Sequence, residues 1–429
     1  MPYIKSIQAI QVFDSRGTPT ISCRIDLESG TSYTSMVPSG ASTGSREALE
    51  LRDGGNAYLG KGVQMAINNI QDTIAPALVG MDVTHQQLID QKMLLLDGSE
   101  TKSNLGANAI LGVSLAVLGA AANETGMPLY QYVNKIYSDI NGVKLKMNLP
   151  IPMLNIINGG EHADNNIDIQ EFMIMPIGAS SFSQGMQWSS EIYAGLKKLL
   201  QDQNLSTGVG DEGGFAPNLK SNNEAIELIM HAITNNGLRP GTDVSIALDC
   251  AATEFYEDNL YHLRGESTEL TSAEFSKYLE SLASKYPIVS IEDGMDESDF
   301  IGWKKLTESL GKKCQLVGDD LFVTNVKELQ RGIDESLGNS ILIKFNQIGT
   351  ITETLKTIHL ANSNNFTSVI SHRSGETEDT IIADICVGLG AGQIKAGAPC
   401  RSDRVAKYNR LLWIEAQNPN LTFAQNVFN

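Results

Sequence analysis

The second half of the chain repeats one pattern, in which a short apolar run rich in β-branched residues leads to a charged residue and then to a helical stretch. The residues at the ends of these runs follow one another mostly at intervals of about 25 to 30 positions, which suits one strand, one helix and two loops. The runs are VSIALD, IVSIED, QLVGDD, ILIK, SVISHR and QIK, and they deliver Asp249, Glu292, Asp320, Lys344, His372 and Lys395. The pattern therefore predicts consecutive strand–helix units.

Charged residues are unfavourable inside a buried strand but are tolerated where the strand ends. In a closed barrel of parallel strands the carboxyl ends converge on one face, and that face carries the active site. Three acidic residues and two lysines at such ends predict a site that binds a divalent metal and an anion and that holds a base.

The first third of the chain has a different organisation. Residues 3–35 alternate and are rich in β-forming residues, which predicts a small antiparallel meander. Helical patterns follow at 46–51, 61–74, 85–95 and 108–122. Strands followed by helices indicate an α+β domain. Residues 134–148 are polar and irregular and are expected to form a connector, so we predict an N-terminal domain at 1–133 and a barrel domain at 134–429.

Three helices of the barrel domain have a recognisable N-terminal capping pattern. Thr271, Asn325 and Thr350 each stand three residues before a glutamate and precede a helical run. A capping side chain followed by an acid in the first turn is typical of a helix N-terminus.

Composition limits the classes of function. The net charge of −18 and the pI near 4.8 oppose nonspecific binding to nucleic acid and to anionic membranes. The cysteine count of five is odd and includes no CxxC pair, which indicates reduced thiols rather than disulfides or a zinc site. The N-terminal segment has no apolar signal region, so we expect a cytoplasmic protein. The apolar stretch 106–122 is shorter than the ~20 residues of a membrane span and is expected to be a core helix.

The three acidic strand ends favour magnesium. Asp249, Glu292 and Asp320 offer hard oxygen ligands, and no histidine or cysteine ends those strands. The alternative for each acid is a capping role in the loop that follows. Asp319 and Asp320 are neighbours on alternate faces, so only one of them is expected to point inward.

The later strand ends offer a base and an anion clamp. Lys344 is a candidate general base if burial and nearby positive charge lower its pKa, and an ion-pair partner of the acids otherwise. Arg373 and Ser374 supply a guanidinium and a hydroxyl that suit a phosphate or carboxylate. His372 fits a structural role as well as a catalytic one.

Two further acids and two loops precede the repeats. Glu212 lies in the glycine-rich segment GVGDEGGF and is a candidate general acid; the alternative is that this segment forms a simple turn without a catalytic role. Glu171 lies in DIQEFM. The loops at 37–44 and 158–166 are rich in glycine and polar residues and are candidate lids, and the second carries His162.

At this point the chain resembles the enolase family, of bacterial type, over its whole length. The most specific segment is ILIKFNQIGTITET at 341–354. It is joined, in the order of the family, by DSRGTPT, VPSGASTG, NGGEHADNN, QEFM, GDEGGFAP, SIEDGMDE, VGDDLFVTN, SHRSGETED and AGAPCRSDR. Two departures stand out: Thr18 where the family often has Asn, and Gly294 where some members have Pro.

The resemblance implies the fold, the reaction and the role of each residue. The fold would be an N-terminal α+β domain followed by an eightfold α/β barrel of TIM type with atypical opening elements. The activity would be that of a hydro-lyase, the reversible dehydration of 2-phosphoglycerate to phosphoenolpyruvate in glycolysis, with two Mg²⁺ ions per site. The family usually forms homodimers, and some bacterial members form larger rings.

The roles implied by the resemblance place Lys344 as base and Glu212 as acid. The remaining assignments are Asp249, Glu292 and Asp320 as ligands of the first Mg²⁺, Ser39 as ligand of the second, Glu171 and Gln170 beside the acid, Arg373 and Ser374 on the phosphate, Lys395 on the carboxylate and His162 on a closing loop, with His372 also in the site.

Two alternatives remain open from the residues. A dehydratase of acid sugars would share the metal acids and the abstraction of an α-proton, but would not need Arg373, Ser374 or Ser39. A non-catalytic protein on the same fold would be expected to lack the base, the acid or a metal ligand, and all are present. A secondary role at the cell surface would not be visible in these residues.

Overall fold

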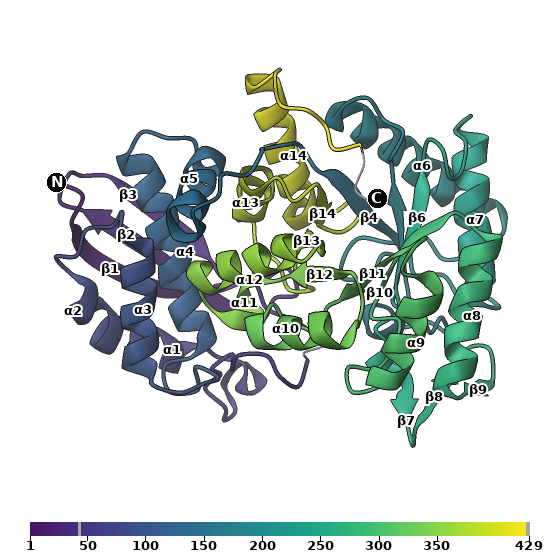
Figure 1. Cartoon of the computed structure of the whole chain (residues 1–429), viewed down its shortest axis with the longest axis horizontal. Coiled ribbons are helices and arrows are strands. Elements are labelled where there is room, and N and C mark those ends of the chain that lie inside the picture. The colour runs from purple at the N-terminus through teal and green to yellow at the C-terminus, as the bar shows by residue number, and fades with distance from the viewer. Residues whose placement is uncertain (42–43, 426–429) are drawn as a thin grey trace.

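The computed structural model describes residues 1–41 and 44–425. The N-terminal domain lies beside a barrel formed by the rest of the chain, and α10–α12 of the barrel domain lie on the side that faces it (Figure 1). In both domains the core is built from aliphatic side chains that are almost completely excluded from solvent.

The N-terminal domain begins with the predicted meander. The strands β1 (Ile4–Phe13), β2 (Pro19–Leu27) and β3 (Ser32–Met36) pair antiparallel in sequence order. Helices α1 (Gln64–Asn69), α2 (Ala75–Leu78), α3 (Gln86–Asp97), α4 (Ala107–Glu124) and α5 (Leu129–Asn141) follow, with a π-helical segment at Ile70–Ile74 between α1 and α2. The three-stranded sheet packs against α4.

Helix α4 is the apolar stretch noted in the sequence. It is long and apolar enough to cross a membrane, but 89% of the window is buried inside the protein. Small residues allow its close packing on the sheet: a Cβ at Gly119 would lie 2.3 Å from a ring carbon of Tyr33. The helix is therefore a core element, as expected.

The barrel closes from eight strands: β4 (Ile151–Asn158), β5 (Glu171–Met175), β6 (Ser245–Asp249), β10 (Ile288–Glu292), β11 (Gln315–Gly318), β12 (Ser340–Ile343), β13 (Thr367–Ser371) and β14 (Gln393–Lys395). All six runs of the sequence pattern are barrel strands. Strand β5 runs antiparallel to both of its neighbours, β4 and β6, and the other pairs are parallel. The predicted fold is thus confirmed, including its atypical opening.

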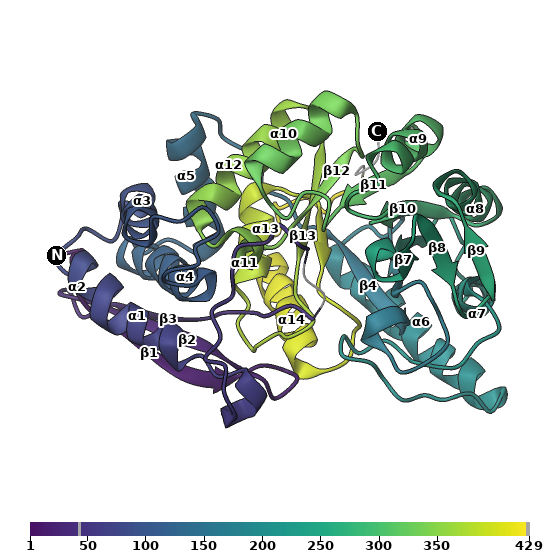
Figure 2. The same ribbon diagram turned by 90° about the horizontal axis from the view of Figure 1, so that it is seen from below.

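Helices surround the barrel (Figure 2). They are α6 (Phe182–Asp202), α7 (Asn222–Asn235), α8 (Ser272–Lys285), α9 (Phe300–Leu310), α10 (Val326–Glu335), α11 (Phe345–Ile348), α12 (Ile351–Ser363), α13 (Ile381–Leu389) and α14 (Ser402–Gln417). A small sheet of β7 (Tyr256–Glu257), β8 (Leu260–Leu263) and β9 (Thr268–Leu270) is inserted before α8. The predicted helix starts are confirmed, since Thr271, Asn325 and Thr350 each accept a hydrogen bond from a first-turn amide.

Two local predictions were wrong. Residues 46–51 form no helix, because their backbone instead hydrogen-bonds to distant segments: the Ala48 amide donates to Gln347 and the Leu49 amide to Thr101. The expected connector at 134–148 is helical as far as Asn141, because α5 buries apolar side chains such as Ile136 and Tyr137, and it packs against α13. The predicted domain boundary after residue 133 therefore falls inside α5.

Candidate active site

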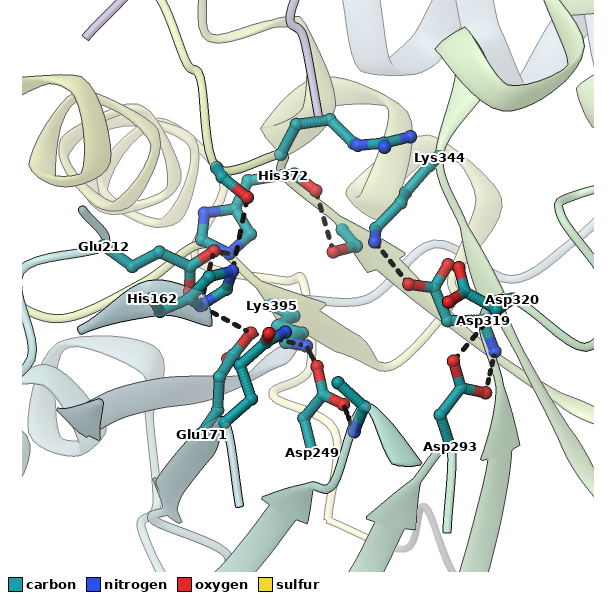
Figure 3. A pocket seen from close by; sticks show the side chains of 15 residues that line it. His162, Glu171, Glu212, Asp249, Asp293, Asp319, Asp320, Lys344, His372 and Lys395 are labelled. Atoms are coloured by element: carbon teal, nitrogen blue, oxygen red, sulfur yellow. Dashed lines mark hydrogen bonds and ion pairs between the residues drawn. The ribbon is translucent and has the colours of Figure 1, made fainter. Parts of the chain in front are cut away.

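A pocket opens at the carboxyl ends of the barrel strands, where the sequence pattern placed its charged residues (Figure 3). Most of its lining residues can carry charge or donate hydrogen bonds. The lining residues are His162, Gln170, Glu171, Glu212, Asp249, Ala251, Asp293, Asp319, Asp320, Lys344, Ser371, His372, Arg373, Ser374 and Lys395. Of the residues predicted for the site, Glu292 and Ser39 do not line this pocket.

Lys395 lies at the centre of one carboxylate group. Its Nζ is 2.8 Å from Asp249, 2.9 Å from Glu292 and 3.1 Å from Glu171. Burial disfavours the ammonium, but the surrounding carboxylates outweigh this effect and raise the pKa of Lys395 well above its usual value. The cluster thus binds a positive charge, which in this structure is the lysine of β14.

The carboxylates of the cluster carry more negative charge than Lys395 alone can neutralise. Burial and the charge of Asp249 raise the pKa of Glu292 well above its usual value, with Asp319 adding to the effect. Burial also acts to raise the pKa of Asp249, but Lys395 outweighs burial and lowers it. Repulsion of this kind is relieved by an additional cation.

Both aspartates that follow β11 line the pocket, contrary to the expectation that only one would. Asp319 is the more buried of the two, and its carboxylate lies 2.5 Å from Nζ of Lys344. Asp320 is nearer the rim and less buried, and burial together with Asp319 raises its pKa well above its usual value. The charge of Asp319, and not that of Asp320, is among the main influences on Glu292.

Asp293 explains how the two aspartates are held. Its carboxylate accepts the backbone amides of Asp319 and Asp320, both at 2.9 Å. Carboxylate oxygens of these three residues lie within 4.8 Å of one another, so the group has the donor atoms of a metal site. Asp293 was not among the predicted site residues, although it directly follows Glu292 in the run IVSIED.

The surroundings of Lys344 favour its charged form. Burial favours its neutral form, but Asp319 outweighs burial and raises the pKa of Lys344. Its backbone is fixed as well, since its amide donates to Thr324 at 2.9 Å. A role as base therefore requires that Asp319 be engaged elsewhere.

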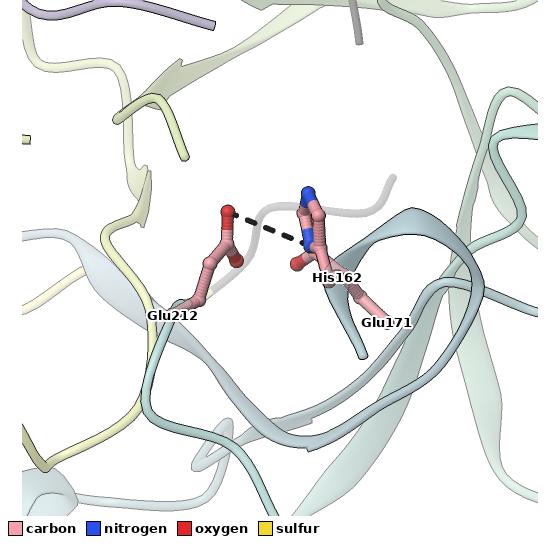
Figure 4. Close-up of side chains that lie close together, drawn as sticks. All are labelled: His162, Glu171 and Glu212. Atoms are coloured by element: carbon pink, nitrogen blue, oxygen red, sulfur yellow. Dashed lines mark ion pairs between the residues drawn. The ribbon is translucent and has the colours of Figure 1, made fainter. Parts of the chain in front are cut away.

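On the other side of the pocket, His162 lies between two glutamates (Figure 4). Its Nδ1 is 3.6 Å from Glu171 and 3.7 Å from Glu212, and all three side chains are buried. Burial and the charge of Glu212 raise the pKa of Glu171 well above its usual value. Burial acts on Glu212 in the same direction, but the nearby His372, His162 and Arg404 outweigh it and hold its pKa low. The opposite shifts favour the protonated form of Glu171 and the ionised form of Glu212.

The loop after β13 carries the predicted anion clamp. Nη1 and Nη2 of Arg373 each lie 3.2 Å from an oxygen of Glu47, which comes from the N-terminal domain. Ser374 lies 3.3 Å from Nε2 of His162. A carboxylate thus contacts both terminal nitrogens of the Arg373 guanidinium, a group that suits a planar or tetrahedral anion, and Arg373 also lines the pocket.

The loop at 37–44 contacts this clamp through its backbone. A Cβ at Gly40 would lie 1.9 Å from Nη2 of Arg373, so only glycine fits this approach. The hydroxyl of Ser39 is buried and bonds to Glu50 and Arg52, both at 3.0 Å, rather than facing the pocket. The structure therefore does not bring Ser39 to the carboxylates, and Ser42 and Thr43 of this loop lie outside the described residues.

The donor set suits magnesium. Asp249, Glu292 and Asp319 supply carboxylate oxygens from three adjacent strand ends, and their mutual repulsion and the embedded ammonium of Lys395 mark a place for positive charge. Gln170, also in the pocket, has a buried side-chain oxygen with no hydrogen-bond partner, which is available to a ligand.

Comparison with known families agrees with this arrangement. Residues 4–133 match the family model described as the N-terminal domain of enolase, and residues 146–425 match the model described as the enolase C-terminal TIM barrel domain. Together the two matches cover nearly the whole chain, in the order in which the two domains are seen here. The chain therefore belongs to the enolase family.

Proposed function

We propose that this protein is a hydro-lyase that reversibly converts 2-phosphoglycerate to phosphoenolpyruvate with Mg²⁺. One observation carries the proposal: Lys344 and the glutamates Glu171 and Glu212 stand on opposite sides of one pocket, which is also lined by further carboxylates and by Arg373 (Figure 3). Removal of a proton on one side and protonation of a leaving group on the other is the arrangement that β-elimination of water requires.

The first chemical problem is the proton α to a carboxylate, which is very weakly acidic because its removal adds charge to an anion. Mg²⁺ bound by Asp249, Glu292 and an aspartate of the β11 turn would supply electrostatic stabilisation of several kcal/mol to that charge. Lys395, already among these carboxylates, would hold the substrate carboxylate. Lys344 would take the proton once Asp319 no longer keeps it charged.

For the third metal ligand we propose Asp319 in place of Asp320. The proposal is supported by the contact of Asp319 with Lys344 and by its influence on Glu292. Asp320 lies closer to the loop at 37–44, since a Cβ at Gly44 would be 3.1 Å from its carboxylate. Ser39 remains a predicted ligand of a second Mg²⁺ only if this loop rearranges.

The second chemical problem is the leaving group, because hydroxide departs poorly unless it is protonated. Glu212 would deliver the proton to the leaving group, and the neighbouring Glu171, whose raised pKa favours its protonated form, would resupply Glu212. His162 lies between the two carboxyls. Gln170 and Glu171 lie beside the acid. Arg373 and Ser374 would hold the phosphate, which would replace Glu47 in the guanidinium fork.

The setting of the activity is also a proposal. Family membership supports a place in glycolysis and gluconeogenesis and a homodimeric or larger assembly. The five cysteines are all free, and four of them are buried, which suits the reducing cytoplasm.

The direct test is the formation of phosphoenolpyruvate from 2-phosphoglycerate, followed by the ultraviolet absorbance of the product. Turnover with Mg²⁺ that stops with a chelator and returns with added Mg²⁺ is the expected result. Folded protein with Mg²⁺ and no turnover would overturn the proposal, and unphosphorylated acid sugars would then be screened as substrates.

A further inference from the structure

Arg404, at the start of α14, is a fully buried cation whose contacts lie at the site and whose role the proposed reaction leaves unexplained. Its side chain is 0% exposed and lies behind the pocket rather than in its lining. A guanidinium needs acceptors for all of its N–H groups when it is removed from water, so its partners show what it is placed to do.

The partners of Nη1 and Nη2 of Arg404 come from both loops that carry site residues, whereas Nε lies 2.8 Å from the carboxylate of Asp403 on its own helix. Nη2 donates to the carbonyl oxygens of Ser374, at 2.6 Å, and Asp211, at 3.1 Å. Nη1 donates to the carbonyl oxygen of Arg373 and lies 2.6 Å from Nδ1 of His372. Arg404 thus links the loop of the anion clamp to the loop of Glu212.

The contact with His372 decides where the imidazole can carry a proton. A guanidinium has only N–H donors, so the ring nitrogen that faces it at hydrogen-bond distance has to accept. Nδ1 of His372 must therefore present a lone pair, and the proton of the neutral ring must be on Nε2. A ring protonated on both nitrogens would place two N–H groups against each other.

The other ring nitrogen faces the proposed acid. Nε2 of His372 lies 3.2 Å from Oε1 of Glu212, although the two groups are not aligned as a formed hydrogen bond. Such contacts often tighten only when substrate is bound. The second oxygen of Glu212 accepts from Asn155 at 3.1 Å. Glu212 therefore accepts a hydrogen bond on one oxygen and faces the His372 ring nitrogen with the other.

We propose that Arg404 is a positioning residue that fixes His372 as a neutral imidazole with its proton on Nε2, so that this N–H is directed at Glu212. The opposite tautomer would turn a lone pair toward the carboxylate and leave Glu212 free to reorient. The consequence for catalysis rests on the proposed role of Glu212 as acid, whereas the tautomer itself depends only on the contacts described.

The charged groups around His372 agree with a neutral ring. Burial, with the charge of Arg404, favours the neutral form, while Glu212 and Glu376 act in the opposite direction. Glu376 is itself paired with Lys407, whose Nζ lies 2.9 Å away. The cation of Lys407 thus offsets the more distant of the two acids.

The test is nitrogen NMR of the full-length protein labelled with ¹⁵N-histidine, in which the six histidines are few enough to assign His372 by comparison with His372→Gln. We expect a protonated Nε2 and a bare Nδ1 that stay unchanged between about pH 5.5 and 8. A proton on Nδ1, or a doubly protonated ring at neutral pH, would overturn the proposal from the wild-type spectrum alone.

Two variants separate positioning from packing. Arg404→Lys keeps a charge but cannot serve His372 and the carbonyl groups together, and we expect its His372 to populate the other tautomer or to become charged. Arg410→Met removes a cation from the same helix whose partner is Asp384 rather than an acid that acts on His372, and its His372 signals should match the wild type. An Arg404→Lys spectrum identical to the wild type would refute the role of Arg404.

Activity measurements distinguish this proposal from the proposed function. In Arg404→Lys the limb of the kcat–pH profile that reports the acid should shift, which a purely structural role would not cause. A chain that forms no phosphoenolpyruvate yet shows the Nε2 tautomer would refute the function and keep the positioning. An active chain whose His372 carries its proton on Nδ1 would refute the positioning role and keep the proposed function.

Discussion

Lys344 and Asp319 form a buried ion pair at the ends of two adjacent strands, β12 and β11, with the ammonium 2.5 Å from the carboxylate. The aspartate that keeps the lysine charged is also one of the groups best placed to bind a metal. Engagement of Asp319 by a cation would therefore weaken its hold on the proton of Lys344. The same contact links metal binding to the availability of a base.

Substitution of the two β11 aspartates distinguishes their roles. Asp319→Asn should remove most of the rise in thermal midpoint caused by Mg²⁺ and reduce kcat/KM by roughly 100-fold or more, because several kcal/mol of charge stabilisation would be lost. Asp320→Asn is the matched control with the same change in charge one residue away, and it should have the smaller effect. If Asp320→Asn is the more damaging of the two, the ligand predicted from the sequence is correct and Asp319 is not.

Lys344→Ala tests the base. We expect it to abolish both water loss and the exchange of the C2 proton of 2-phosphoglycerate with solvent, since no other lysine lining the described pocket lies on that side (Figure 3). Exchange is followed by NMR in D₂O, with circular dichroism to confirm folding. Exchange that persists at the wild-type rate would remove Lys344 as the base.

Glu212→Gln tests the acid. The amide has nearly the shape of the carboxylate and its oxygen can still accept from either Asn155 or His372, but its NH2 group can neither accept from the other donor nor deliver a proton. We expect C2 exchange to remain measurable while formation of phosphoenolpyruvate stops. Glu171→Gln is the informative comparison, because it alters the coupled partner without removing Glu212. Equal survival of both reactions in Glu212→Gln would show that this residue is not the acid.

The barrel could be predicted because its signal is local. Six of the eight barrel strands are marked by an apolar run rich in β-branched residues, and three of the helices by a capping residue such as Thr271. Where backbone groups bond across the molecule, local patterns fail. The segment at 46–51 has a helical pattern, but its amides are satisfied by residues near 101 and 347, which no local sequence rule reveals.

The residues of the site also divide into those that a local pattern predicts and those that depend on distant contacts. Residues at strand ends, such as Asp249 and Lys395, were found because topology alone brings them together. The choice between Asp319 and Asp320 depends on the turn after β11, which Asp293 holds through two backbone amides. Arg404 was overlooked because it acts through a contact with His372 from a helix outside the strand pattern.

The stability of the protein should depend on pH through His372, whose pKa is lowered by burial from 6.5 to about 4. Between these values the unfolded chain binds a proton that the folded protein does not, so stability falls as the pH decreases through this range and is fully present above it. A shift of this size corresponds to about 3 kcal/mol.

Urea unfolding of the wild type and of His372→Gln, measured from pH 7.5 to pH 4.5, isolates this contribution because the carboxylates are common to both. The difference in free energy of unfolding between the two proteins should shrink as the pH falls, since glutamine accepts from Arg404 and donates to Glu212 without titrating. A difference that stays constant over this range would show that His372 is not held neutral by the fold.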